Sequence, residues 1–137
     1  MIAPRPHHAR ARTDEAGQSL VEFAMMLPVL FLVVFGLIAF GHTFGKQLDL
    51  KSATRDGARR GAVSITNADP ATVARQGVLR SLTLTPDSDV AVTVSPASPW
   101  NHGDQISVKS STPYEYNIMG VTLWKGNLRA EAKIRVE

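Results

Sequence analysis

The sequence contains no cysteine, so no disulfide can stabilise the fold and no thiolate can act as nucleophile or metal ligand. It also has no charged residue between Phe23 and Gly45, whereas charges recur every few positions in most of the remaining chain. Nucleotide-binding and metallopeptidase signatures are missing too, because the chain has no G-x-G-x-x-G, Walker A or H-E-x-x-H stretch. These absences predict a protein that is not an enzyme and that has no catalytic residues, no cofactor and no metal site.

The remaining polar and aromatic residues add no catalytic constellation. Asp87 and Asp89 fall in a predicted turn, where paired carboxylates usually serve the turn itself. Trp100 and Trp124 are interpreted as core or interface residues rather than as ligand platforms. The four histidines are scattered without the spacing of metal ligands, at His7, His8, His42 and His102.

The positive charge is unevenly placed. The formal net charge is +3, yet residues 65–137 contain as many acidic as basic side chains, and the excess lies beside the uncharged run. Basic residues that flank an apolar segment suit lipid headgroups better than a nucleic-acid groove. We therefore expect contact with membrane lipid and no nucleic-acid partner.

The run from Phe23 to Gly41, "FAMMLPVLFLVVFGLIAFG", carries no polar stripe. At about 1.5 Å per residue, a helix of this length approaches the roughly 30 Å hydrocarbon core of a bilayer. Pro28 is compatible with this interpretation, since membrane helices tolerate proline better than helices in water do. The run therefore predicts a transmembrane helix.

Two other interpretations of the same run stay open. One is a secretory signal peptide cleaved after Ala39-Phe40-Gly41, although its apolar core exceeds the usual 7 to 15 residues. The other is an uncleaved signal-anchor. Basic residues stand on both sides of the run, so the positive-inside rule does not determine the orientation.

The stretch "AGQSLVEF" joins a short polar leader to the apolar run. This arrangement resembles the processing site of type IV prepilins and pseudopilins. The resemblance implies that a membrane peptidase cuts after Gly17 on the cytoplasmic side, leaving Gln18 as the new N-terminus and Glu22 as the carboxylate used in assembly. The physical chemistry is consistent, because glycine offers no side-chain obstacle to an extended backbone in a protease cleft.

Glu22 is costly in hydrocarbon unless it is paired. The new α-ammonium group of a neighbouring subunit is an available partner, and such a pair would set the axial register between subunits. The alternative is that Glu22 only marks the membrane interface, where a carboxylate near a helix N-terminus is favourable.

Beyond the run, residues 46–64 are rich in helix formers and contain no proline. Gly57 and Gly61 belong to a face of mostly small residues, which lets another backbone come close. This face is expected to seat the C-terminal sheet or a neighbouring subunit. It comprises Leu50, Ala53, Thr54, Gly57 and Gly61, while Lys51, Arg55 and Arg59 lie on the opposite, solvated face.

The pieces "GQSLVEF", the following "LP" and "ATRDGARRGA" resemble the TadE-like family of minor pilins from tight-adherence (Flp-type) pilus systems. The resemblance is close over residues 14–64. It implies a single-pass protein of the bacterial inner membrane, with a cytoplasmic N-terminus and an extracytoplasmic C-terminal domain. The implied partners are the prepilin peptidase, other pilin or pseudopilin subunits and the pilus assembly platform. The alternative is a membrane-anchored binding module that joins no filament.

The expected fold class is α+β and type IV pilin-like, with a long N-terminal transmembrane helix, a second short helix and a small antiparallel sheet. The expected division is a leader at 1–17, a transmembrane helix with an amphipathic extension at 18–64, and an extracytoplasmic domain at 65–137. Asp69 and Pro70 predict the start of the second helix, which ends near Leu82. Its buried stripe would comprise Ala71, Ala74, Val78 and Leu82.

Alternating apolar residues predict the strands. "DVAVTVS" and "GDQISVKSS" predict an antiparallel hairpin with a longer connection, and "VTLWKGN" a short strand and turn. "NLRAEAKIRVE" predicts a final strand with one apolar face and one charged face.

Overall fold

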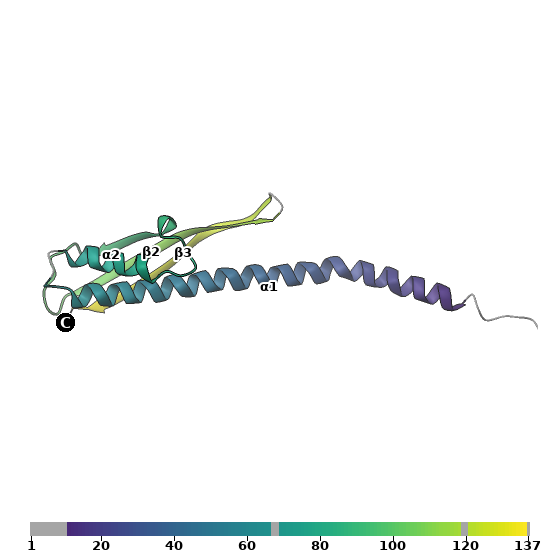
Figure 1. Cartoon of the computed structure of the whole chain (residues 1–137), viewed down its shortest axis with the longest axis horizontal. Coiled ribbons are helices and arrows are strands. Elements are labelled where there is room, and N and C mark those ends of the chain that lie inside the picture. The colour runs from purple at the N-terminus through teal and green to yellow at the C-terminus, as the bar shows by residue number, and fades with distance from the viewer. Residues whose placement is uncertain (1–10, 67–68, 119–120, 137) are drawn as a thin grey trace, which may run out of the picture. The chain divides into compact units, whose positions relative to one another are not determined.

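The computed structural model describes residues 11–66, 69–118 and 121–136. Within these ranges, two helices and three strands make up an α+β fold (Figure 1), as the sequence predicts. The helices are α1 (Ala11–Val63) and α2 (Pro70–Ser81), and a short 3-10 turn, η1 (Asp87–Asp89), follows them. The strands are β1 (Ala91–Ser95), β2 (Gln105–Ile118) and β3 (Val121–Arg135).

The chain divides between Phe40 and Gly41 into two compact units, and α1 contributes to both. α1 ends at Val63, next to the predicted boundary at residues 64 and 65, and the predicted division into three segments stays a prediction. Of the predicted leader, residues 1–10 lie outside the described residues. Residues 11–17 belong to α1, and four of these seven residues, two alanines, one arginine and one glutamate, favour helix.

In the first unit, the apolar run of α1 is exposed along its length. Among the described residues, the helix is long and apolar enough to cross a membrane, with a mean hydropathy of 2.7 in its most apolar stretch. None of that stretch is buried inside the protein. Pro28 lies within the helix and does not end it. One apolar N-terminal helix of this kind fits a single-pass membrane protein.

In the second unit, α2 packs on α1 through small residues. Asp69 caps α2 as predicted, since its carboxylate accepts a hydrogen bond from Thr72 N at 3.3 Å and Pro70 opens the helix. Within α2, Ala74 and Val78 are fully buried, and Gly77 is buried as well. A Cβ added at Gly77 would lie 3.0 Å from the Cα of Gly57, so the absence of side chains lets the helices approach closely.

The sheet has the order β1-β2-β3 and is antiparallel throughout. Val94 pairs with Val108, and Val108 pairs with Ala132, which aligns the apolar faces of the three strands. Ile106 and Val108 are fully buried and form a core cluster with residues of α1 and α2. Trp100 joins this core with 6% exposure, in agreement with its interpretation as a core residue.

The predicted short strand and turn at "VTLWKGN" is wrong, because these residues belong to one continuous strand, β3. Gly126 pairs with Tyr114 across the strands instead of turning the chain. The Tyr114 ring covers this glycine, and a Cβ added there would lie 3.0 Å from the ring. An aromatic neighbour of this kind compensates for glycine in a strand.

Beyond the end of β1, strands β2 and β3 continue as a two-stranded arm. The pairing of β1 ends opposite Ser111, so Pro113 lies where β2 has a neighbour on one side only. Proline is tolerated at such an edge, because no strand needs its missing N–H. The arm contacts α1 where Thr43 Oγ1 donates a hydrogen bond of 2.5 Å to the Tyr116 hydroxyl.

Candidate functional site

Gly17, Gln18 and Glu22 all lie on α1, close to the start of the apolar run. The Gln18 side chain donates a hydrogen bond from Nε2 to Glu22 Oε1 at 3.1 Å, one helical turn along. A Cβ added at Gly17 would meet nothing within 4 Å. Packing in the folded chain therefore does not require glycine at position 17, and the reason for glycine there lies elsewhere.

Glu22 heads an apolar face of the helix. Residues three and four positions apart share one face of an α-helix, and a shallow hollow follows this spacing from Glu22 to Val33. Its other lining residues are Met25, Met26, Val29 and Leu30. Met25 is 75% exposed and Met26 70% exposed, so this face is available to lipid or to another helix.

Glu22 and the apolar face that follows it could together bind a partner. A carboxylate at the head of an apolar face can pair with a cation while the face below it packs against hydrocarbon. Gln18 supplies only a neutral donor to Glu22, so the carboxylate charge is not neutralised by this contact. Among the described residues, no group of three or more potential ligand side chains is placed to hold a metal ion.

Gly57 and Gly61 lie at a second place, in the second unit, and α2 covers both. A Cβ added at Gly57 would lie 2.4 Å from Val78 Cγ2 and 2.7 Å from the Ala74 carbonyl oxygen. At Gly61 it would lie 2.6 Å from Ala74 Cβ. The small-residue face of α1 is thus occupied by an element of the same chain.

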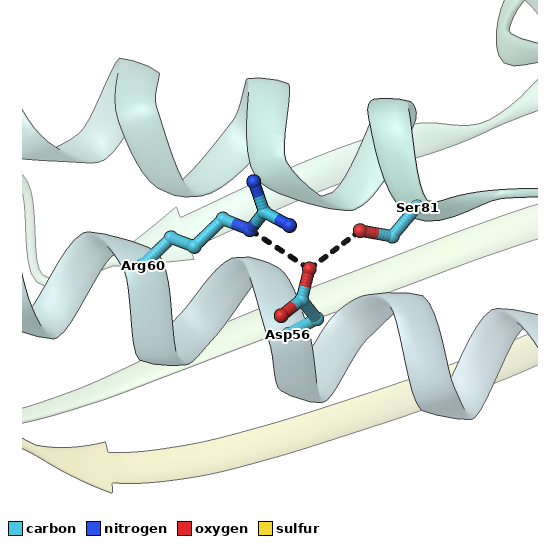
Figure 2. Close-up of polar contacts among 3 residues, drawn as sticks. All are labelled: Asp56, Arg60 and Ser81. Atoms are coloured by element: carbon cyan, nitrogen blue, oxygen red, sulfur yellow. Dashed lines mark hydrogen bonds and ion pairs between the residues drawn. The ribbon is translucent and has the colours of Figure 1, made fainter.

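The sequence interpretation missed two carboxylates that connect α1 to α2 and the loop after it. Asp49 accepts hydrogen bonds from Leu84 N at 2.9 Å and from Thr83 Oγ1 at 2.8 Å. Asp56 accepts one from Ser81 Oγ at 2.6 Å and one from Arg60 Nε at 2.8 Å (Figure 2). Their spacing of seven residues, which places them on one helix face, was the available signal.

A comparison with known protein families covers residues from both regions, the start of the apolar run and the glycines under α2. Residues 17–59 match the family model described as TadE-like protein. The match begins at Gly17, includes Glu22 and Gly57, and ends before Gly61. No curated protein and no solved structure matches the chain. The predicted resemblance to the TadE-like family is therefore confirmed over residues 17–59, and in this part the chain is similar to TadE-like proteins.

Proposed function

We propose that this chain is a minor pilin or pseudopilin of a tight-adherence pilus. A prepilin peptidase removes the leader after Gly17, and the apolar helix stays in the inner membrane until the subunit joins other pilins at the assembly platform. The role is structural and not enzymatic. The N-terminus is cytoplasmic, and the second unit is extracytoplasmic.

The observation that carries the proposal is the family match beginning at Gly17, where glycine has no packing role. Because packing does not require glycine at position 17, we attribute this glycine to recognition by the peptidase before the subunit assembles. Cleavage after Gly17 would make Gln18 the first residue and would place the new α-ammonium one helical turn from Glu22.

The exposed face below Glu22 supports assembly through the helix. Large apolar side chains cover it, including Val29 at 65% exposure and Met25 at 75%. Helices pack in a membrane by van der Waals contact and by satisfying polar groups. A carboxylate at the head of such a face would favour one axial register, in which it meets the α-ammonium of a neighbour.

N-terminal sequencing of the membrane-extracted protein tests the processing step. The protein should begin at Gln18 in cells that contain the cognate peptidase and at Met1 in cells that lack it. The variant Gly17→Ala should keep the fold, because the added Cβ meets nothing within 4 Å, but should be cut much less. A start at Met1 in peptidase-positive cells would contradict the proposal, and a start after Gly41 would identify a signal peptide instead.

Substitution of Glu22 tests the assembly step. We expect Glu22→Ala to be cleaved normally but to be largely lost from complexes with partner pilins, whereas Glu22→Asp keeps a carboxylate and part of the incorporation. Co-purification after membrane extraction measures both. Normal incorporation of Glu22→Ala would reduce Glu22 to a boundary residue. Purification of the wild-type chain without pilin-like partners would favour the membrane-anchored binding module.

A further inference from the structure

Most of the large, exposed apolar side chains of the second unit gather near one end of it. We call four of them the membrane-proximal collar: Phe44, Leu48, Leu84 and Trp124. Each is more than half exposed, with values of 60%, 59%, 57% and 66%. Among the described residues from Gly41 onward, Val63 is the other large apolar side chain exposed to this degree, at the far end of α1.

A contact and the strand register place Leu84 and Trp124 close to the turns of α1 that carry Phe44 and Leu48. Leu84 Cδ1 would lie 3.6 Å from a Cβ added at Gly45. Trp124 lies directly opposite Tyr116 in the register of β2 and β3, and the Tyr116 hydroxyl bonds to Thr43. Phe44 and Leu48 belong to α1 itself. The collar therefore lies at the level of residues 43–48.

Within the second unit, the two-stranded arm runs along α1 from Thr54 to Thr43. Ser110 contacts Thr54 through its hydroxyl, and further along the strand Tyr116 contacts Thr43. Each strand residue advances about 3.3 Å, so the strand beyond Tyr116 continues in the same direction. Figure 1 shows this end of the β2–β3 hairpin extending past α2.

Trp124 has an unusual position on the arm. Opposed residues of an antiparallel pair share a face of the sheet, so Trp124 is on the same face as Tyr116, which contacts α1. Tyr116 is half-buried there, whereas Trp124 remains 66% exposed. The sequence from 116 to 124 carries no charged residue, and Lys125 follows immediately.

The membrane surface must fall at this level of α1. The apolar run ends at Gly41, and the first charged residue after it is Lys46. Tryptophan and tyrosine are enriched where hydrocarbon meets headgroups, and lysine side chains extend from this zone toward the phosphates. The collar, the arm tyrosines, Lys46 and Lys125 have this composition.

We infer that the membrane-proximal collar is embedded in the headgroup and upper acyl region of the bilayer that holds the apolar run. The side chains of the collar then contact lipid directly. The partner is phospholipid, and the inference depends on the proposed retention of residues 23–41 in the membrane. The collar thus provides a second membrane contact, formed by segments far apart in the sequence.

Tryptophan fluorescence of the full chain in phosphatidylcholine–phosphatidylglycerol vesicles tests the inference. Vesicle flotation comes first, because a chain that does not float contradicts membrane retention itself, and with it the proposed function. In Trp100→Phe, the remaining emission comes from Trp124. It should be blue-shifted and lose most of its intensity to lipids brominated near the headgroup. If Trp100→Phe does not fold, the difference between the wild type and Trp124→Phe gives the same signal.

Single-cysteine labelling provides a matched control, because the chain has no cysteine of its own. A nitroxide at Leu84→Cys should be more accessible to oxygen than to a water-soluble nickel chelate, and the same label at Val63→Cys should show the reverse. The control is equally apolar and comparably exposed, at 66% against 57%. If a floating chain shows Trp124 unquenched by bromolipid, or equal accessibility at the two sites, the inference is wrong while the membrane span stands.

Discussion

Glycines and large apolar residues occur in both parts of α1, but they lie in opposite environments. From Gly17 to Phe40 the helix buries none of its large apolar side chains, and Gly17 and Gly36 have open space around them. From Gly41 to Val63 the same helix buries Leu50 completely, and Gly57 and Gly61 are in close contact with α2. The first part exposes its apolar side chains to whatever surrounds the chain, whereas the second part is packed at the centre of a folded domain.

This difference shows that glycine has two distinct roles in the helix. A glycine in a helix interior costs roughly 0.5–1 kcal/mol relative to alanine. At Gly57 this cost is offset by close packing of two helices, whereas at Gly17 and Gly41 no contact offsets it. Residue type therefore does not reveal which role applies, and the contacts around each glycine do.

Substitution of glycine by alanine should produce the largest difference between the two parts. Gly57→Ala should reduce the free energy of unfolding of the second unit by about 3 kcal/mol, because the new Cβ would overlap Val78 and the Ala74 carbonyl. Gly41→Ala, where nothing lies within 4 Å, should be neutral or stabilising by less than about 1 kcal/mol. Thermal unfolding of the full chain in detergent, followed by near-ultraviolet circular dichroism, measures both.

Equal melting temperatures for these two variants would contradict the comparison. Gly61→Ala adds a graded test, since its Cβ would lie 2.6 Å from Ala74 Cβ and 3.3 Å from Ala74 Cα, whereas at Gly57 two backbone atoms of α2 lie at 2.7 Å. We expect an effect between the other two and closer to that of Gly57→Ala, because alanine has no side-chain torsion that could move its Cβ away, so α2 itself must shift.

A hydroxyl pair in the core should produce the next largest effect. Thr54 and Ser110 are buried and hydrogen-bonded to each other, and Thr54 also donates to the Leu50 carbonyl at 2.6 Å. Thr54→Val leaves the Ser110 hydroxyl buried without this partner and should cost about 1–3 kcal/mol. Ser110→Ala should cost less, because Thr54 keeps its bond to Leu50.

Urea unfolding of the single and double variants measures this asymmetry. The double variant should be no less stable than Thr54→Val alone. Removing the Ser110 hydroxyl, which has lost its partner, also removes the desolvation penalty of that hydroxyl. Additive losses would show that the two hydroxyls act independently, and that the sheet does not depend on this bond to α1.

Local signals explain which parts of the fold were predictable. The start of α2 follows from Asp69 and Pro70, which act within one helical turn, and the final strand follows from the strict alternation from Leu128 to Val136. Gly126 was misleading because its role depends on Tyr114, a residue from another strand. In the uncleaved chain α1 also includes residues 11–17, and the predicted leader stays a prediction.

The candidate sites divide in the same way. Gly17 and Glu22 could be proposed as site residues from the sequence alone, because they stand directly beside the apolar run. Asp49 is not recognisable, because its partners at Thr83 and Leu84 return to α1 only after α2 has folded against it. The collar was equally hidden, since Leu84 and Trp124 are far apart in the sequence and come together only at one end of the domain.

The smallest expected effect on stability concerns the N-terminal cap of α2. This helix covers the second part of α1 and, among the described residues, has no counterpart against the first part. Hydrogen bonds from the Thr72 hydroxyl, the Ser98 hydroxyl and the Thr72 backbone lower the pKa of Asp69 below its ordinary value. Because the folded state favours the ionised carboxylate, its stabilising effect is complete above the unfolded pKa, near 3.9, and is lost as the pH falls through the folded value. In Asp69→Asn, a neutral cap replaces the carboxylate. The wild type should therefore melt slightly higher than this variant at pH 7, and the gap should close as the pH is lowered below 4. A gap that stays constant with pH would mean that the charge of Asp69 contributes nothing, and that hydrogen-bonding geometry alone holds the start of α2.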